Sequence, residues 1–230
     1  MDAMELQNTI NFGPIFIFIL IFSGIALGII LQIKRKKMLK RFALEHGYNY
    51  LGSGSVESLP SLYLQVGHSR RVSHVISGSI EKHPVRFFDF RSIIGHGKHK
   101  RHVTFSVCEL KYDANLRRFL ILSRQMRFGP GNLYDGFQNG FGREIKMEGD
   151  FHKYFKVYVP EDYEIEVFQI FTPDIMVKFI DLAKGFTFEF VDDKILVYTR
   201  GLIYKKETME KIHELARMLV SEFAQKIKRI

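Results

Sequence analysis

The chain has 230 residues, one cysteine and a formal net charge of +9 at pH 7. This length fits one ordinary domain with its own core, and a lone Cys108 excludes an intramolecular disulfide and with it the disulfide-stapled secreted class. A basic chain suits either nucleic acid or an anionic membrane surface. The sequence holds no nucleic-acid recognition motif, so we expect no nucleic-acid partner and favour the membrane.

The first structural element is an uncharged apolar run at residues 14–33. About 19 helical residues span roughly 28 Å, the thickness of the hydrocarbon core of a bilayer. A cleaved signal peptide would need a basic start and a small-x-small cleavage site. Residues 1–13 instead carry Asp2 and Glu5 without Lys or Arg, so the sequence predicts an uncleaved transmembrane helix after a short tail.

Six basic residues follow the apolar run within eight positions: Lys34, Arg35, Lys36, Lys37, Lys40 and Arg41. An excess of Lys and Arg marks the cytoplasmic side. We therefore expect a single-pass protein of the inner membrane, with its N-terminus outside and a cytoplasmic C-terminal domain. The basic residues are also candidate contacts for anionic lipid headgroups. Helical spacing continues over residues 34–47, and Gly47 is a suitable residue to end this juxtamembrane helix.

Gly24 and Gly28 form a small-x-x-x-small pair within the predicted span. Such pairs let two membrane helices approach closely, so this face is a candidate for homodimerisation. Glycine is also simply common in membrane helices, and that alternative stays open.

Residues 48–230 read as an α+β domain. Period-two alternation predicts strands at 72–80, 85–91, 103–107 and 119–122, with a turn at His83-Pro84, which together make an antiparallel meander. His74 shares a strand face with apolar residues, so we expect a hydrogen-bonded core histidine. Residues 128–142 are rich in glycine and predict a long loop, whose role the sequence leaves open.

The last third predicts a compact α+β unit. Thr172-Pro173-Asp174 is a helix start, and the helix should run to Gly185. Strands are expected at 186–190 and 195–198, joined by a turn at Asp192-Asp193. Apolar residues from Ile212 to Ile227 then follow helical spacing. This terminal amphipathic helix should cover the sheet; the alternative is a helix lying on the membrane through Lys226, Lys228 and Arg229.

Histidines gather in one loop, at His96, His99 and His102. Zinc is a weak hypothesis here because the surrounding cations oppose a metal and no cysteine or second ligand pair is nearby. Gly95-x-Gly97-Lys98 does not fit a nucleotide phosphate loop, so we predict no cofactor. The loop is better interpreted as a solvated basic tip, in which Lys98, Lys100 and Arg101 contact a phosphate headgroup or a partner. Cys108, in the middle of a strand, is expected to be a small buried hydrophobe.

Several segments carry a resemblance to a known group. These are Phe87-Phe88-Asp89-Phe90 after the Gly78 strand, the Gly95-x-Gly97-Lys98 loop, Phe171-Thr172-Pro173-Asp174-Ile175-Met176, and Asp193-x-Ile195-Leu196-Val197-Tyr198. Over residues 48–198 the chain resembles a widespread group of uncharacterised prokaryotic membrane-anchored proteins with a domain of unknown function. The resemblance implies a shared fold and carries no activity with it.

Two functional hypotheses remain. The favoured one is a non-enzymatic interaction module at the inner membrane face, with lipid or protein as its partner. The alternative is a membrane-tethered hydrolase or transferase that uses the histidine-rich loop 96–102, and it requires these histidines to converge with a carboxylate in a cleft.

Overall fold

The computed structural model describes residues 13–55, 61–126, 142–223 and 226, which form parts of two compact units, Met1–Met38 and Leu39–Ile230. Except for Gly142, the glycine-rich segment 128–142 lies outside the described residues. So do residues 1–12 of the predicted N-terminal tail, and Lys228 and Arg229.

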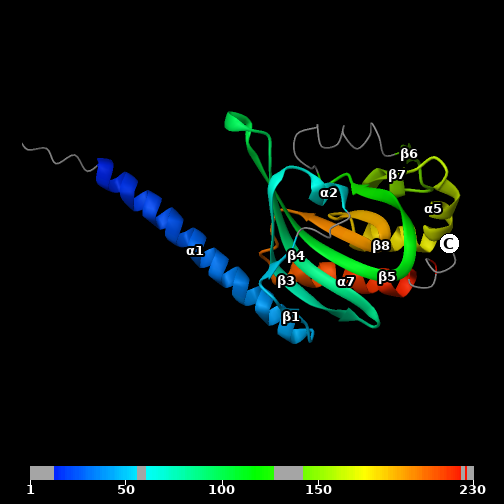
Figure 1. Cartoon of the computed structure of the whole chain (residues 1–230), viewed down its shortest axis with the longest axis horizontal. Helices are drawn as coiled ribbons and strands as arrows, with labels where there is room; N and C mark the ends of the chain where they lie inside the picture. Colours follow the sequence, from blue (N-terminus) through cyan, green and yellow to red (C-terminus); the bar gives the residue numbers. More distant parts are fainter. Residues whose placement is uncertain (1–12, 56–60, 127–141, 224–225, 227–230) are drawn as a thin grey trace, which may run out of the picture. The chain divides into compact units, whose positions relative to one another are not determined.

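Helix α1 (Gly13–Glu45) contains the predicted span (Figure 1). Its segment Phe16–Glu45, which contains an 18-residue window of mean hydropathy 2.7, is the one helix of the described chain that is long and apolar enough to cross a membrane. The apolar side chains of residues 16–33 are exposed, which is the arrangement expected of a helix surrounded by lipid. The structure therefore supports an N-terminal membrane anchor.

The last turns of α1 belong to the second unit. Leu39, Phe42 and Ala43 are buried there. Gly47 ends the helix with a positive φ of 69°, and the amides of Gly47 and Tyr48 donate back to the carbonyls of Leu44 and Ala43. This pattern is a Schellman motif, which confirms Gly47 as the residue that closes the helix.

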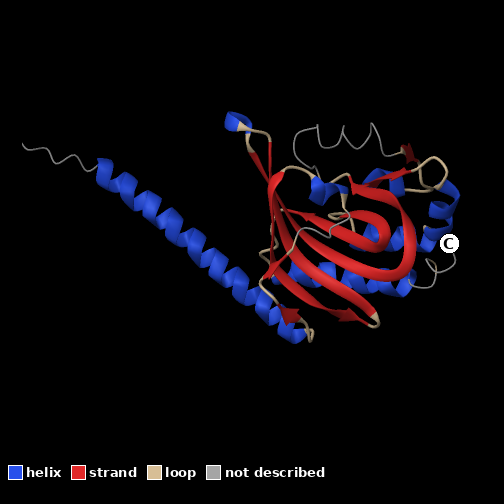
Figure 2. Ribbon diagram, viewed as in Figure 1, coloured by secondary structure: helices blue, strands red, loops and turns tan. Residues whose placement is uncertain are grey.

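The described strands of the second unit form one antiparallel eight-stranded sheet of strong curvature (Figure 2). The order is β1-β3-β4-β5-β7-β6, with β2 also paired to β3 and β8 also paired to β5. The strands are β1 (Asn49–Tyr50), β2 (Ser53–Gly54), β3 (His68–Ile80), β4 (His83–Ile94), β5 (Arg101–Ser123), β6 (Arg143–Ile145), β7 (Phe155–Val159) and β8 (Thr187–Arg200).

Helices lie on both faces of the sheet. The described helical elements after α1 are α2 (Leu62–Gln65), the 3₁₀ turn η1 (Gly97–His99) between β4 and β5, α4 (Phe151–Tyr154), α5 (Glu164–Ile170), α6 (Pro173–Leu182) and α7 (Lys206–Phe223). Together with the sheet they confirm the predicted α+β class. The predicted start of α6 is confirmed, with Thr172 before the helix and Pro173 in its first turn. The terminal amphipathic helix is confirmed as α7, which packs on β3 and β5.

The structure corrects three sequence predictions in the sheet. Residues 103–107 and 119–122 belong to one long strand, β5, and residues 187–190 and 195–198 belong to β8, with Phe186 just before it. These two strands pair with each other from Ser106 and Thr199 to Ile121 and Phe188, so the predicted turn at Asp192-Asp193 was wrong. Asp192 instead lies within β8 opposite Leu116, between two register shifts whose extra residues belong to β5. Its φ is 52°, a conformation that aspartate tolerates better than most residues.

The predicted turn at His83-Pro84 was also wrong. Ile80 pairs with His83, so the two-residue turn is Glu81-Lys82, and Pro84 lies within β4 opposite Ser79. Glu81 has a φ of 56°, as the first central residue of a tight hairpin turn requires. The error is one of boundary rather than of topology.

Alternation along the central strands buries both faces of the sheet. On one face, Phe190 stacks on Phe119 at 4.0 Å between ring centroids and contacts Phe223 of α7 at 5.7 Å. On the other, Leu196 and Tyr198 join a second apolar cluster with Tyr63 and Leu64 of α2. Large residues at successive positions of β4 and β8 are therefore core residues on opposite faces.

Candidate functional site

The predicted basic tip is the end of the β4–β5 hairpin, which extends beyond the rest of the sheet (Figure 1). Lys98, Lys100 and Arg101 are exposed there, as are His96, His99 and His102. Gly95 and Gly97 both have positive φ and make the sharp bend around η1. The tip therefore presents six cationic or titratable side chains to its surroundings.

The three histidines of the tip do not share one arrangement. His96 stacks on His68 of β3, with ring centroids 5.2 Å apart and planes within 3°. His68 also contacts the carbonyl of Gly95, at 3.3 Å from Nε2. His102 lies in the strand opposite Ile93. In the part of the chain that the structure describes, no carboxylate hydrogen-bonds to His96, His99 or His102, so the constellation required by the tethered-enzyme hypothesis is not assembled among these residues.

The predicted contacts on α1 are arranged along its polar end. Lys34, Lys36, Lys37, Lys40 and Arg41 are exposed, whereas Arg35, on the same helix, is buried at 4% exposed. Arg41 pairs with Glu45 at 2.8 Å, and Lys40 lies 5.5 Å from the centre of the Tyr50 ring. Gly24 and Gly28 lie on the exposed part of α1, where a β-carbon at either would have no neighbour within 4 Å.

The structure assembles a second group of titratable residues that the sequence did not indicate, which we call the His46–His213 cluster: His46, Tyr48, Glu210 and His213. His46 Nε2 lies 3.0 Å from Glu210 Oε2, and the Tyr48 hydroxyl lies 2.8 Å from His213 Nε2. The two imidazole rings lie 4.1 Å apart, centroid to centroid. All four residues lie within the second unit.

Three local features position the cluster. The Schellman motif at Gly47 turns the chain so that His46 and Tyr48 lie beside α7. Glu210 and His213 are three residues apart, so both project from one face of α7. Gly78 of β3 leaves room for the Tyr48 ring, because a β-carbon there would lie 2.0 Å from Tyr48 Cδ1.

An aromatic floor supports the cluster. Phe42 is 1% exposed and contacts the rings of His46 at 4.5 Å, Phe87 at 5.6 Å and His213 at 5.7 Å. At the rim, Lys206 of α7 pairs with Glu45 at 2.7 Å. The cluster thus joins the end of α1 to α7 through both apolar and polar contacts.

Burial sets the protonation states inside the cluster. It lowers the pKa of His213 to about 4, with nearby His46 acting in the same direction, so His213 is neutral at pH 7. Burial raises the pKa of Tyr48 to about 12, so its hydroxyl stays protonated and available for the hydrogen bond to His213. Neutral imidazole beside a carboxylate can accept a proton, donate a hydrogen bond or bind a metal ion.

His46, Glu210 and His213 also satisfy the distance requirement for a shared ligand. One donor atom from each lies within 4.8 Å of the donors of the other two, and among the described residues this is the group of three that does so. Glu210-x-x-His213 on a helical stretch is a signal in the sequence that could have indicated half of this group. Its partner, His46, lies 164 residues before Glu210, and no sequence spacing indicates such a pairing.

A buried carboxylate lies elsewhere, on the opposite face of the sheet. Glu189 accepts hydrogen bonds from Ser61 Oγ, Tyr198 hydroxyl and the Leu62 amide, at 2.7, 2.9 and 2.9 Å. Arg118 Nε lies 3.4 Å from it. Burial raises the pKa of Glu189, against the effect of these hydrogen bonds. With its oxygens occupied by protein donors, Glu189 serves to hold α2 on the sheet.

Cys108 is fully buried, and burial raises the pKa of its thiol well above the usual value. The prediction of a small buried hydrophobe is confirmed.

His74 is half-buried, and its Nδ1 lies 2.6 Å from the Tyr50 hydroxyl. It is hydrogen-bonded as expected, but at the edge of the core rather than within it.

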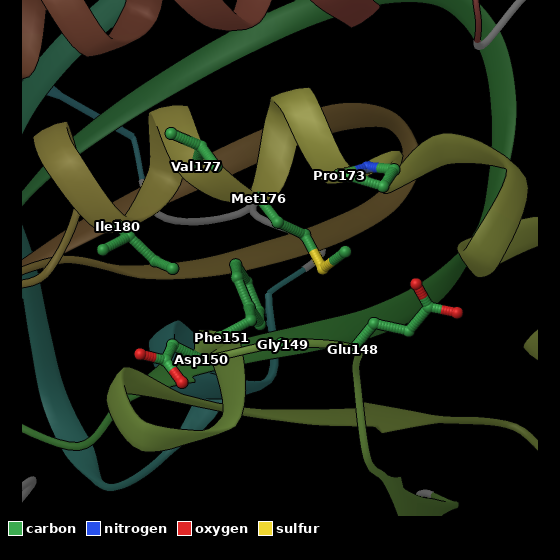
Figure 3. Close-up of a pocket in the computed structure, with 8 residues that line it drawn as sticks. All are labelled: Glu148, Gly149, Asp150, Phe151, Pro173, Met176, Val177 and Ile180. Atoms are coloured by element: carbon green, nitrogen blue, oxygen red, sulfur yellow. The ribbon is translucent and has the colours of Figure 1, made fainter.

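A hollow of about 210 Å³ lies between α6 and the segment before α4 (Figure 3). Its walls are mainly apolar, and Glu148 and Asp150 lie at its border: the lining is Glu148, Gly149, Asp150, Phe151, Pro173, Met176, Val177 and Ile180. Pockets that hold drug-sized ligands measure about 300–1,000 Å³. The hollow is smaller than this range and contains none of the predicted site residues.

No protein-family model matches the chain, and a search of curated proteins returns no match. Among solved structures, the fold is similar to that of the mycobacterial trehalose monomycolate transport factor A, TtfA, with a TM-score of 0.57. The sequences are 11% identical, and the match covers 80% of this chain and 92% of that one. At this identity the likeness shows a shared fold.

Proposed function

We propose that this protein is a single-pass, non-enzymatic interaction module at the inner membrane face, and that its domain contacts anionic lipid headgroups. The observation that carries the proposal is α1, in which an exposed apolar span continues into turns that are buried in the domain. Only the short basic segment 34–38 separates the span from the domain, so the domain stays within reach of the headgroups.

Charge supports the proposed orientation and partner. Basic residues follow the span while Asp2 and Glu5 precede it, as expected of a cytoplasmic domain and an outside N-terminus. A basic residue near an anionic leaflet gains about 1 kcal/mol, so Lys98, Lys100 and Arg101 at one hairpin tip supply a useful attraction. The exposed tip, rather than a cavity, is the feature suited to this contact.

The structural neighbour shares the fold and supplies no activity for this chain. TtfA is described as a transport factor for trehalose monomycolate. We extend to this chain the idea of a factor, and not the cargo. The hollow beside α6, at about 210 Å³, is too small to enclose a molecule with a long acyl chain.

The test is flotation of a chain comprising residues 39–230 with vesicles of anionic lipid and with vesicles of zwitterionic lipid. We expect binding to the anionic vesicles, lost on raising the salt concentration. The triple variant Lys98→Glu, Lys100→Glu, Arg101→Glu should lose it. A variant with the same change in net charge, Lys82→Glu, Lys146→Glu, Lys211→Glu, alters exposed lysines on other elements and should retain binding.

Equal loss in both triple variants would show that net charge alone drives binding and would refute the role of the tip. No binding by the unmodified domain would refute the lipid partner and favour a protein partner.

We also propose Gly24 and Gly28 as the packing face of a homodimer. Cross-linking of the full chain in membranes should detect a dimer that Gly24→Leu, Gly28→Leu abolishes, and an unchanged dimer would refute this face.

A further inference from the structure

We infer that His46, Glu210 and His213 bind one divalent transition-metal ion of the zinc class, joining the end of α1 to α7. The inference is independent of the proposed lipid contact. It rests on three donors of the right chemistry that lie within 4.8 Å of one another, two of them on α7 and the third, His46, directly after α1.

The donor set is one that zinc uses. Two imidazoles and one carboxylate form a His₂Glu site, in which a water or a fourth protein group completes a tetrahedron. The Tyr48 hydroxyl lies 2.8 Å from His213 Nε2 and orients this ring. Borderline-soft imidazole donors favour zinc-class ions over magnesium or calcium, which prefer sites made of oxygen.

The distances require little movement. Zinc–donor bonds of about 2.0–2.1 Å place neighbouring donors of a tetrahedral site about 3.3 Å apart. His46 Nε2 and Glu210 Oε2 are already 3.0 Å apart. The other donor pairs lie within 4.8 Å, so each needs to approach by no more than about 1.5 Å to reach that spacing.

The supporting structure is rigid. Glu210 and His213 lie on α7, whose opposite face is fixed in the core through Leu215, Leu219 and Phe223. His46 is fixed by the Schellman motif and by Phe42. A site on such elements keeps its ligand atoms closer to the geometry that binding requires than a site on an exposed loop does. His96, His99 and His102 at the hairpin tip lack this support.

Charge around the cluster is mixed. Glu210 supplies one negative charge, and Glu45 lies near the rim, where Lys206 occupies it. Arg217, one turn further along α7, acts on His213 as a cation. The positive charge of a bound dication is therefore balanced mainly by Glu210. We expect that replacing this carboxylate with an amide of the same shape reduces the affinity for the ion strongly.

The test uses the full chain in detergent, freed of metal with a chelator, and then titrated with Zn²⁺. We expect one ion per chain by calorimetry and by metal analysis after gel filtration. Affinity should fall at least tenfold in His46→Gln, Glu210→Gln and His213→Gln. The matched control, His96→Gln, His99→Gln, His102→Gln, should keep the full affinity. Co²⁺ should give the intense visible absorption of tetrahedral coordination in the unmodified chain and lose it in His46→Gln.

Thermal unfolding provides a second readout, since His46 is partly exposed and its variant is expected to fold. Zinc at about 100-fold over its Kd should raise the Tm of the unmodified chain by about 5–10 °C and leave His46→Gln unchanged. The inference is overturned by three results: no zinc bound, zinc bound equally by the three single variants, or zinc lost in the hairpin control.

Discussion

The hairpin tip and the His46–His213 cluster place histidines in opposite settings. At the tip, His96, His99 and His102 are close in sequence, yet they are exposed, and within the described residues His96 is the one of the three seen to contact another ring, that of His68. In the cluster, His46 and His213 are distant in sequence, yet their rings lie 4.1 Å apart with a tyrosine and a carboxylate in hydrogen-bond range. Here the histidines that are close in sequence lie on an exposed surface. The histidines that form a hydrogen-bonded cluster are brought together by tertiary packing.

The largest expected effect comes from removing the floor of the cluster. Phe42→Ala should lower the free energy of unfolding by about 3–5 kcal/mol, because a fully buried ring contacting Phe87 and both histidines is lost. Denaturant unfolding checks this. The control is Leu44→Ala, two residues along the same helix, where the side chain is 81% exposed and the change should stay within about 0.5 kcal/mol. Equal effects would show that α1 does not pack as described.

Gly78→Ala tests the packing of the Tyr48 ring on β3 by adding one carbon atom. The added β-carbon would lie 2.0 Å from the Tyr48 ring, which must move and release His213. We expect a loss of about 1–3 kcal/mol in stability. The matched control is Gly185→Ala, where a β-carbon meets nothing within 4 Å and should cost no more than about 0.5 kcal/mol. A silent Gly78→Ala would mean that Tyr48 does not lie on β3.

The pH dependence of stability tests the burial of His213. Its pKa falls from 6.5 to about 4 on folding, so between these values the unfolded state binds more protons and stability decreases as the pH is lowered from 7 to 4. This loss should amount to about 1–3 kcal/mol. The groups facing His213 are His46, Tyr48, Glu210 and Arg217.

The measurement is unfolding of the metal-free protein against pH, compared with His213→Gln, which cannot take up the proton. Subtracting the two curves cancels other groups, including Glu189, whose raised pKa acts in the opposite direction. A difference that does not change between pH 7 and 4 would contradict the burial of a neutral His213.

The smallest expected effect on stability belongs to the hairpin tip. Lys98→Glu, Lys100→Glu, Arg101→Glu changes exposed residues only, so the free energy of unfolding should change by no more than about 0.5 kcal/mol. The same variant should lose binding to anionic vesicles. A large loss of stability would show that the tip is a structural part of the sheet rather than a surface for contact.

Local sequence patterns predicted the elements that depend on interactions between residues close in sequence. The uncharged run before Lys34, the Gly47 helix end, the Thr172-Pro173 helix start and the apolar stripe of α7 all follow from side-chain spacing and capping. The strands were found because large residues alternate along them. The lengths of the strands were not predicted, since Asp192-Asp193 indicates a turn in the sequence, whereas the pairing of β8 with β5 continues through Asp192.

The basic tip was predictable because it lies within seven residues of sequence. The His46–His213 cluster was not, because it depends on the packing of α7 against the end of α1 and on the space left by Gly78. Glu189 was equally hidden, since a carboxylate inside an aromatic strand has the same sequence signature whether it faces solvent or a buried set of donors.

The central claim, an anchored domain on the inner face, is tested most directly by thiol labelling in intact cells. Cys108 is fully buried and gives little background. The account predicts that a membrane-impermeant maleimide labels Asn8→Cys, before the span, in intact cells. It should label Lys82→Cys, an exposed site in the domain, only after permeabilisation. Labelling of Lys82→Cys in intact cells would contradict the proposed topology, and with it the inner-face role.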